Sequence, residues 1–434
     1  MAPRVDHVES DPALPAHTEV VVIGGGIIGA STALFLARKG IPVALCEKGR
    51  IGAEQSSRNW GWCRTMGRDV REIPLAAESL RLWRQMDTLT GRTTGFRETG
   101  IAYFCETEAE LAAHDGWLDA ARLHQVRSLR LGPAEAAALA PGAAIRWAGA
   151  IHTPQDGQAE PALAAPAIAK AARAAGAAVL TNCAVRGMET TGGRVSGVVT
   201  ERGRIGCASV VLAGGAWSRL FCGNHGIDLP QLKVLGSVLR TAPLPGGPEI
   251  TAGGARWGLR RRADGGYTVA QRNAAAAEIV PDSFRLLRDF LPAWWQERRT
   301  LRLHLGRRFI EEARLPRRWA PDAPSPFERV RVLDPTPIDA TAEGGRRALI
   351  RAFPIFRDAA VEERWGGLMD VTPDAVPVIG PVAALPGLFL ATGFSGHGFG
   401  IGPGAGRLTA ELVAGETPVV DPAPFRFERF RRAA

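Results

Sequence analysis

The chain has 434 residues, of which 46% are hydrophobic and 22% are charged, and its net charge is +9. This length is enough for two or three domains with large cores, and the composition is ordinary for a globular protein. The positive charge comes almost entirely from arginines spread along the sequence, which argues against nucleic-acid binding. An anionic substrate and simple compositional bias explain this charge equally well.

The cysteines and the N-terminal segment bear on compartment and targeting. The six cysteines form no CxxC pair and show no metal-ligand spacing, so we expect reduced core residues of a cytoplasmic protein and no metal site. Residues 1–17 are polar and lack the apolar core of a signal peptide, so we expect a disordered tail. No apolar run reaches about 18 residues, so we expect no transmembrane segment.

The stretch 18–47 predicts a strand, a glycine turn, a helix and a second strand that ends on an acid. Gly24 allows the tight turn, Gly26 lets the backbone approach a pyrophosphate, and Gly29 lets helix and strand pack closely. The helix N-terminus offers N–H groups to the phosphates, and Glu47 is placed to bond an adenosine ribose. This combination predicts a dinucleotide site, although an isolated glycine turn would be weak evidence.

Further along the chain, hydrophobic periodicity and turn residues predict alternating helices and strands. We expect helices over 73–90, 108–123, 133–140, 161–175 and 405–414, and strands over 100–105, 178–181, 193–200, 205–213 and 388–392. The stretch 256–272 predicts a hairpin that turns at Asp264-Gly265-Gly266. Residues 273–360 are rich in proline and arginine and give no clear pattern.

Two more glycine segments follow buried strands, far from the first. The strand at 209–213 runs into Gly214-Gly215, and the strand at 388–392 runs into the glycine-rich stretch 393–406. His397 lies between two glycines of that stretch, which favours a role in a site. The separation predicts one nucleotide domain built from three chain segments, with a second domain inserted between them.

Taken together, these segments resemble the D-amino-acid oxidase superfamily of flavoproteins, the group with glycine oxidase, sarcosine oxidase and D-amino-acid dehydrogenase. The resemblance is carried by the stretches 20–47, 56–61, 210–215, 365–380 and 393–399. It implies FAD as cofactor and an α/β fold, α+β overall, with a Rossmann-like FAD-binding domain and an antiparallel-sheet substrate domain. We expect the FAD domain at 18–90, 145–220 and 361–420, the substrate domain at 91–144 and 221–360, and a C-terminal tail at 421–434.

The resemblance also implies the residues of the site. His397 and Arg64 are the expected catalytic residues. The expected cofactor-binding residues are Gly24, Gly26, Ile27, Ile28, Gly29, Glu47, Lys48, Ser56, Ser57, Asn59, Trp60, Gly61, Val185, Ala213, Gly214, Trp217, Gly393, Gly396, His397, Gly398, Phe399 and Gly400.

Several positions depart from the family pattern. Asn59 and Met369 stand where relatives attach flavin to a His or a Cys, so we expect non-covalent FAD. Met369 also stands where amino-acid oxidases carry a carboxylate-binding Arg, and Gly400 stands where sarcosine oxidase has a Lys. The lysine used for oxygen activation is also missing. Arg64, Arg260, Arg272 and His397 are alternatives for binding a carboxylate.

The resemblance implies oxidation of the C–N bond of an amino acid or of a secondary or tertiary amine by hydride transfer, giving an imine that hydrolyses. The alternatives are oxidation of a 2-hydroxy acid or glycerol phosphate on the same scaffold, and a flavin-binding subunit of a larger amine dehydrogenase complex. The electron acceptor, oxygen or a quinone or other carrier, is left open, as is assembly into a homo-oligomer.

Overall fold

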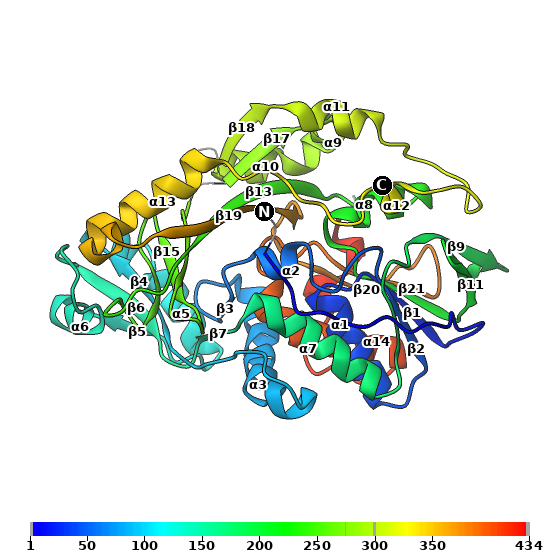
Figure 1. Cartoon of the computed structure of the whole chain (residues 1–434), viewed down its shortest axis with the longest axis horizontal. Coiled ribbons are helices and arrows are strands. Elements are labelled where there is room, and N and C mark those ends of the chain that lie inside the picture. The colour runs from blue at the N-terminus through cyan, green and yellow to red at the C-terminus, as the bar shows by residue number, and fades with distance from the viewer. Residues whose placement is uncertain (1–2, 274, 298–300, 431–434) are drawn as a thin grey trace.

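The chain folds around two large sheets, described in a computed structural model for residues 3–273, 275–297 and 301–430 (Figure 1). The first is a six-stranded sheet with the strand order β20-β21-β12-β1-β2-β8. Its neighbouring strands pair in parallel, except that β20 and β21 are antiparallel. The strands are β1 (Val20–Ile23), β2 (Val43–Cys46), β8 (Ala178–Leu180), β12 (Ser209–Leu212), β20 (Val378–Pro381) and β21 (Leu388–Thr392).

Both faces of this sheet are covered, which explains why its central strands are apolar at every position. Val20 and Val22 point into a core shared with several helices, whereas Val21 and Ile23 point into a second core on the opposite face. The first core contains residues of α1 (Ile27–Arg38), α3 (Ile73–Thr90), α7 (Pro161–Ala174) and α14 (Gly398–Ala414); the second contains residues of the three-stranded sheet of β9 (Val185–Thr191), β10 (Arg194–Thr200) and β11 (Gly203–Gly206).

Helices α1 and α14 approach each other closely because small residues face one another between them. A Cβ added at Gly406 would lie 2.3 Å from the Cβ of Ser31, and one at Gly402 would lie 2.7 Å from a side-chain carbon of Ile27. Gly29 allows an equally close approach between α1 and the turn after β1, since its added Cβ would lie 1.9 Å from the carbonyl oxygen of Gly24. The first and last helices of the nucleotide-binding half are therefore packed backbone to backbone.

The second sheet has ten strands and is mostly antiparallel. Its longest pair is β13 (Leu232–Thr241) with β19 (Val361–Val371), in register from Leu232 opposite Val371 to Thr241 opposite Val361. Helix α13 (Asp339–Ala352) lies along it, in gold in Figure 1, and shares its core. The other strands are β4 (Ile101–Cys105), β5 (Leu129–Leu131), β6 (Gly149–Thr153), β14 (Thr251–Gly253), β15 (Gly258–Arg261), β16 (Tyr267–Ala270), β17 (Ala275–Ile279) and β18 (Leu301–Leu305).

The stretch that gave no sequence pattern contains an appendage at the end of this sheet, shown at the top of Figure 1. After β17 the chain forms α9 (Pro281–Arg285) and α10 (Leu287–Glu297), returns as β18, and forms α11 (Arg307–Arg314). Strands β17 and β18 pair in parallel. The chain then crosses back over the six-stranded sheet through α12 (Pro326–Arg329) to reach α13.

Several predicted elements match the structure closely. Helix α3 spans the predicted residues, and Leu75, Leu80, Leu82 and Met86 are buried as expected. The predicted hairpin is formed by β15 and β16, which pair in antiparallel register. The remaining elements are α2 (Gln55–Arg58), β3 (Trp62–Cys63), η1 (Val70–Glu72), α4 (Glu108–Ala112), α5 (Asp115–Leu123), α6 (Pro133–Leu139), β7 (Gly157–Gln158), η2 (Gly215–Trp217), α8 (Ser218–Asn224), η3 (Pro354–Arg357), η4 (Ala423–Phe425) and η5 (Phe427–Phe430).

Three predicted elements are wrong in extent. The helix predicted over 108–123 is two helices, α4 and α5. The strand predicted over 205–213 is β11 followed by β12, which lie in different sheets. The last helix begins at Gly398 rather than at 405, because packing of its glycines against α1 outweighs their low helix propensity.

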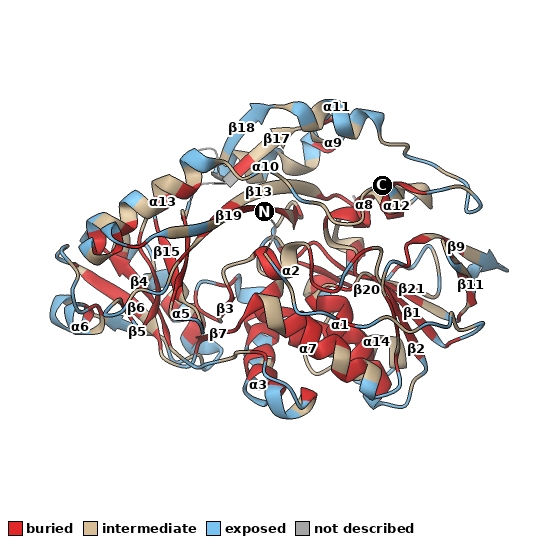
Figure 2. Ribbon diagram, viewed as in Figure 1, coloured by how far each residue is buried: buried red, intermediate tan, exposed pale blue. Residues whose placement is uncertain are grey.

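Both ends of the chain pack against the fold and so differ from the tails expected of them, although Figure 2 shows most of residues 3–17 as intermediate or exposed. Near the N-terminus, the amide N–H of Val179 donates to Asp11 at 2.7 Å and the side chain of Val8 is buried. Near the C-terminus, Phe425 and Phe427 are buried. The division into FAD and substrate domains at the stated boundaries stays a prediction. No helix in the described part of the chain has the length and apolar character that a membrane span needs.

Replacing Gly406 with alanine tests the contact between α1 and α14. The added methyl group would overlap Ser31 and its backbone, so we expect the free energy of unfolding to fall by about 1–3 kcal/mol. Gly223→Ala in α8 is the matched control: its added Cβ meets no atom within 4 Å, so stability should be unchanged or rise by up to about 1 kcal/mol. Urea unfolding of both variants would measure this, and equal effects would contradict the close packing.

Candidate active site

A cavity with an empty volume of about 1230 Å³ opens at the carboxyl ends of β1, β2 and β12. Ligands of open α/β sheets bind at this end of the strands. The walls come from all three glycine segments, together with residues of the crossing segment around α12. A cavity lined by three segments far apart in the sequence suits an extended cofactor.

The structure places most of the expected cofactor residues in this cavity wall and some behind it. The lining includes Gly24, Gly26, Ile27, Ile28, Glu47, Lys48, Ser56, Asn59, Val185, Ala213, Gly214, Trp217, Gly396, Gly398 and Phe399. The lining does not include Gly29, Ser57, Trp60, Gly61, Gly393, His397 and Gly400. Their roles as cofactor contacts stay predictions, and the second group has local structural tasks described below.

The first glycine turn is shaped to receive phosphate groups. A Cβ on Gly24 would lie 2.4 Å from the carbonyl oxygen of Ala213, so only glycine fits there at its φ of +107°. Gly26 is the N-cap of α1 and offers no side-chain cap to the helix N–H groups. Uncapped N–H groups at a helix N-terminus bind anions well, so these residues fit a dinucleotide pyrophosphate.

Glu47 holds the turn together at the end of β2. Its carboxylate accepts the amide N–H of Gly25 and that of Gly49, each at 2.7 Å. Burial raises the pKa of Glu47, and the positive charge of Lys48 opposes this rise. The carboxylate therefore links the glycine turn to the following loop as well as facing the cavity.

The loop that includes α2 is ordered by its own polar side chains. Ser56 accepts the amide N–H of Ile27 at 2.8 Å, which joins this loop to the start of α1. Asn59 donates to the carbonyl of Ser56 at 2.8 Å and accepts the N–H of Gly61 at 2.7 Å. Ser57 is buried behind the loop and donates to the carbonyl of Glu54. Ser57 and Gly61 thus shape the loop without lining the cavity.

The sequence did not predict one part of the cavity wall, because that part comes from residues 273–360, where no clear pattern is present. Phe327 and Arg331 line the cavity from the segment that follows the appendage. Lys48 donates to the carbonyl of Val330 at 2.8 Å, and Arg331 pairs with Glu201. These bonds hold the segment across the nucleotide end of the cavity. Nothing local in the sequence marks it, since its partners lie more than a hundred residues away.

Asp370 is a second missed residue, and it joins the two sheets. It lies near the end of β19, and its carboxylate accepts the N–H of Gly393 at 2.7 Å, the hydroxyl of Thr392 at 3.2 Å and the amide of Gln231 at 3.3 Å. Its carbonyl accepts the N–H of Ser395 at 2.8 Å. Burial raises the pKa of Asp370. The sequence does not reveal this role, because Asp370 comes next to the glycine segment only in the folded chain.

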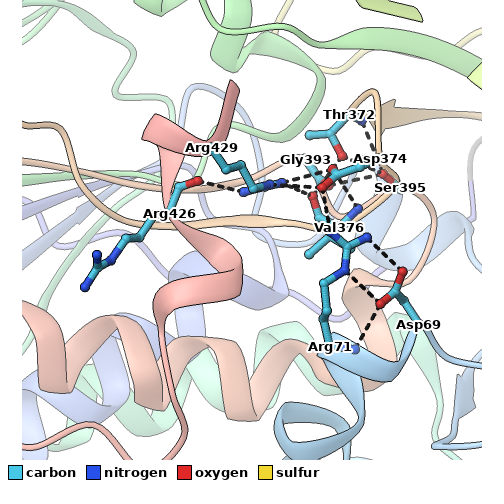
Figure 3. Close-up of polar contacts among 9 residues, drawn as sticks. All are labelled: Asp69, Arg71, Thr372, Asp374, Val376, Gly393, Ser395, Arg426 and Arg429. Carbon is cyan, nitrogen blue, oxygen red and sulfur yellow. Dashed lines mark hydrogen bonds and ion pairs between the residues drawn. The ribbon is translucent and has the colours of Figure 1, made fainter. Parts of the chain in front are cut away.

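The stretch 393–400, called the glycine segment below, is also held from its outer side (Figure 3). Arg429 in η5 forms an ion pair with Asp374 at 3.0 Å, and Arg71 bonds the same carboxylate at 3.1 Å. The turn that contains Asp374 reaches the glycine segment through the N–H of Thr372, which donates to Ser395 at 3.3 Å. Three distant parts of the chain therefore brace one loop.

His397 is the N-cap residue of α14, does not line the cavity and has a side chain that is 28% exposed. Its Nδ1 lies 3.6 Å from an oxygen of Glu72, whose side chain is fully buried. Burial lowers the pKa of His397 to about 4, and the positive charge of Arg68 adds to this effect. The imidazole is therefore neutral near pH 7. Unlike a free histidine side chain, whose pKa near neutrality suggests a proton-transfer role, it does not titrate in this range.

Two guanidinium groups flank one tyrosine on the far side of β3. The guanidinium carbon of Arg272 lies 3.9 Å from the ring centre of Tyr103, and that of Arg64 lies 5.8 Å from it. The backbone nitrogen of Arg64 would lie 3.4 Å from a Cβ added at Gly400, so the backbone of Arg64 adjoins the glycine segment. Arg260 lies apart from it, since its guanidinium is buried against Glu160 at 2.7 Å.

Comparison with known proteins is consistent with this geometry. The family described as FAD-dependent oxidoreductase matches residues 19–412. The chain is 29% identical to glycine oxidase of Pseudomonas aeruginosa, over 94% of this chain and 97% of the relative. It is 28% identical to 4-methylaminobutanoate oxidase (formaldehyde-forming) of Paenarthrobacter nicotinovorans, over 97% of this chain. The chain spans only 46% of that relative's length.

Among solved structures, the L-amino acid deaminase from Proteus myxofaciens in complex with anthranilate has a TM-score of 0.96 with this chain. The two are 34% identical, and the match covers 100% of this chain and 98% of the other. The mixed α/β architecture, with its parallel and antiparallel sheets, is thus shared with flavoenzymes over the whole length.

The bonds of Glu47 can be tested by changing it to glutamine. The new amide NH₂ group would face one of the two backbone N–H groups, so we expect at least about tenfold weaker FAD binding from one lost charge-assisted hydrogen bond. Flavin bound per chain, measured by absorbance after dialysis, would report this. Glu19→Gln, on an exposed residue just before β1, is the control. Full flavin retention in Glu47→Gln would contradict the assigned role.

The lowered pKa of His397 makes a prediction about acid stability. A folded pKa of about 4 lies below the usual 6.5, so the unfolded chain binds more protons between these values and stability falls as pH drops. Between pH 6.5 and 4.5 the loss from this residue is about 2 kcal/mol. His397→Gln should lack that component in urea unfolding at the two pH values, whereas His124→Gln, on an exposed helix end, should retain it. Identical pH dependence in His397→Gln and the wild type would contradict a buried neutral imidazole.

Proposed function

The chain belongs to the FAD-dependent oxidoreductase family, and from this premise we propose that it oxidises the C–N bond of an amino acid or amine. Its cofactor is FAD, and its relatives are named as oxidases, dehydrogenases and a deaminase. Within the class we favour an α-amino acid, because the chain is 34% identical to an L-amino acid deaminase and has two guanidinium groups near Tyr103 that form no ion pair with a carboxylate of the described residues.

Those guanidinium groups are the observation that carries the proposal. Arginine binds a carboxylate with two parallel hydrogen bonds, which fixes the orientation of the substrate as well as its charge. Arg64 and Arg272 flank Tyr103, and neither forms an ion pair with a carboxylate among the described residues. Arg260 is engaged by Glu160 and His397 is neutral, so Arg64 and Arg272 are the better candidates of the four considered from the sequence.

The chain's own residues would position the substrate rather than react with it. FAD supplies the acceptor for the two electrons and the hydrogen that leave the substrate carbon. Trp62 and Tyr103, whose ring centres are 6.2 Å apart, give an aromatic wall that limits water, and the guanidinium groups hold the carboxylate. The substrate leaves as an imine, which water hydrolyses. This scheme needs no side-chain base if the bound amine is neutral.

The test is anaerobic bleaching of the flavin by a substrate panel. Denaturation and filtration first establish whether the flavin leaves the chain, as we expect for a non-covalent cofactor. The folded holoenzyme is then mixed without oxygen with D- and L-amino acids, N-methyl amino acids, 2-hydroxy acids and glycerol phosphate. We expect bleaching by amino acids or N-methyl amino acids within seconds. Bleaching by the hydroxy compounds alone would contradict the proposal.

Reoxidation of the bleached enzyme then identifies the electron acceptor. The missing oxygen-activating lysine favours a dehydrogenase, so we expect slow recovery of the yellow colour in air and fast recovery with a soluble quinone. Bleaching by the isolated chain would also argue against a subunit that needs a partner for substrate oxidation.

A further inference from the structure

Arg68 and Glu72, two buried side chains beside the glycine segment, have polar atoms without a hydrogen-bond partner in the described chain, and so has His397, whose side chain is 28% exposed. These are two guanidinium nitrogens of Arg68, both carboxylate oxygens of Glu72 and Nδ1 of His397. Arg68 is 6% exposed and Glu72 is fully buried. Buried polar groups are almost always hydrogen-bonded, because leaving them unpaired is costly. A bound group or water must therefore complete this cluster when the enzyme is at work.

Positive charge is in excess around the same place. Arg64, Arg68 and Arg272 form no ion pair within 4.0 Å with any carboxylate of residues 3–273, 275–297 and 301–430. Burial lowers the pKa of Arg68 to about 9, and the charge of Arg64 adds to this effect. Burial also lowers the pKa of Arg272, again with a contribution from Arg64. Arg64 is therefore close enough to repel each of the other two guanidinium groups.

The nearby carboxylates compensate only part of this charge. Glu72 lies on the His397 side of the cluster. Asp156 accepts bonds from the backbone and hydroxyl of Thr65 and from the N–H of Met66, so its oxygens are already occupied. Burial raises the pKa of Asp156 to about 6, which leaves it ionised at neutral pH. Neither acid forms a hydrogen bond or an ion pair within 4.0 Å with the side chain of Arg68.

We propose that the substrate is an amino acid with two carboxylates and that Arg68 binds the second one. A substrate with one carboxylate, held by Arg272 and Arg64, would leave Arg68 without an acceptor, whereas a second carboxylate would supply oxygens for its unpartnered nitrogens. Arg272 and Arg64, on either side of Tyr103, would take the carboxylate next to the reacting carbon. The inference rests on the proposed amine oxidation and specifies its substrate.

The position of Arg68 supports this division of roles. It follows Arg64 by four residues in the loop that leads from β3 to α3, so both guanidinium groups belong to one short segment. Arg64 has a local bond to the carbonyl of Met66, whereas Arg68 has no described acceptor for two of its nitrogens. A guanidinium buried without an acceptor is suited to a ligand that brings two oxygens.

The first experiment compares substrates that match in shape and differ in charge. Glutamate is paired with glutamine, aspartate with asparagine, and iminodiacetate with sarcosine, each as substrate for anaerobic bleaching of the holoenzyme. We expect kcat/KM for the dicarboxylate to exceed that for its partner by about 100-fold in at least one pair, because the neutral compound leaves the buried guanidinium unpaired.

The second experiment changes the arginine. Arg68→Met should lower kcat/KM for the preferred dicarboxylate by about 100-fold and leave that for its neutral partner within about threefold, with Arg68→Lys recovering part of the loss. Arg84→Met, on an exposed residue of α3, is the matched control. Glutarate and butyrate, followed by the shift that they cause in the flavin absorption spectrum, give a readout that needs no turnover. Glutarate should bind at least about tenfold more tightly, and only when Arg68 is present.

The outcomes separate the inference from the proposed function. If a neutral partner reduces the flavin as fast as the dicarboxylate, amine oxidation stands and the second carboxylate site is refuted. If glutarate and butyrate bind equally to the wild type, the cluster holds only water and the inference is likewise refuted. If no amine of either kind bleaches the flavin, the proposed function fails and the inference fails with it.

Discussion

The buried carboxylate of Asp370 is the interaction on which the rest of the site depends. It stands on a strand of the antiparallel sheet and bonds the backbone where the last parallel strand ends. The same oxygen meets Gln231, which precedes the strand paired with its own. One acid therefore sets the distance between the two sheets and the path of the glycine segment. A carboxylate in a buried place is costly unless it is bonded this fully, and Asp370 draws its partners from two distant segments, at Gln231 and at residues 392–395.

The sequence predicts the parts of the molecule whose signals are local. The first strand, the glycine turn, Glu47 and helix α3 follow from spacing and periodicity, and the structure places them as expected. The predicted start of α14 was wrong. Its glycines favour a loop on propensity alone, whereas close packing against α1 makes them helical. Asp370, Phe327 and Arg331 could not be predicted, since each gains its position from residues far away in the chain.

The polar groups beyond the cavity show how burial changes side chains that look ordinary in a sequence. His397 was singled out as a group that titrates near neutrality, yet burial and neighbouring arginines keep it neutral. Nothing in the sequence distinguishes Arg68, because one arginine among many is usually a surface residue. Its burial without a partner is what distinguishes it. Enzymes often tolerate such unfavourable groups where a ligand will satisfy them.

The ion pair of Arg429 with Asp374 has a consequence for how the protein is made. The dinucleotide turn is synthesised before the glycine segment, α14 and η5. Because residues of both the first turn and the glycine segment line the cavity, a nascent chain cannot enclose the cofactor until the glycine segment has been made. The brace on that segment forms later still, when Arg429 reaches Asp374.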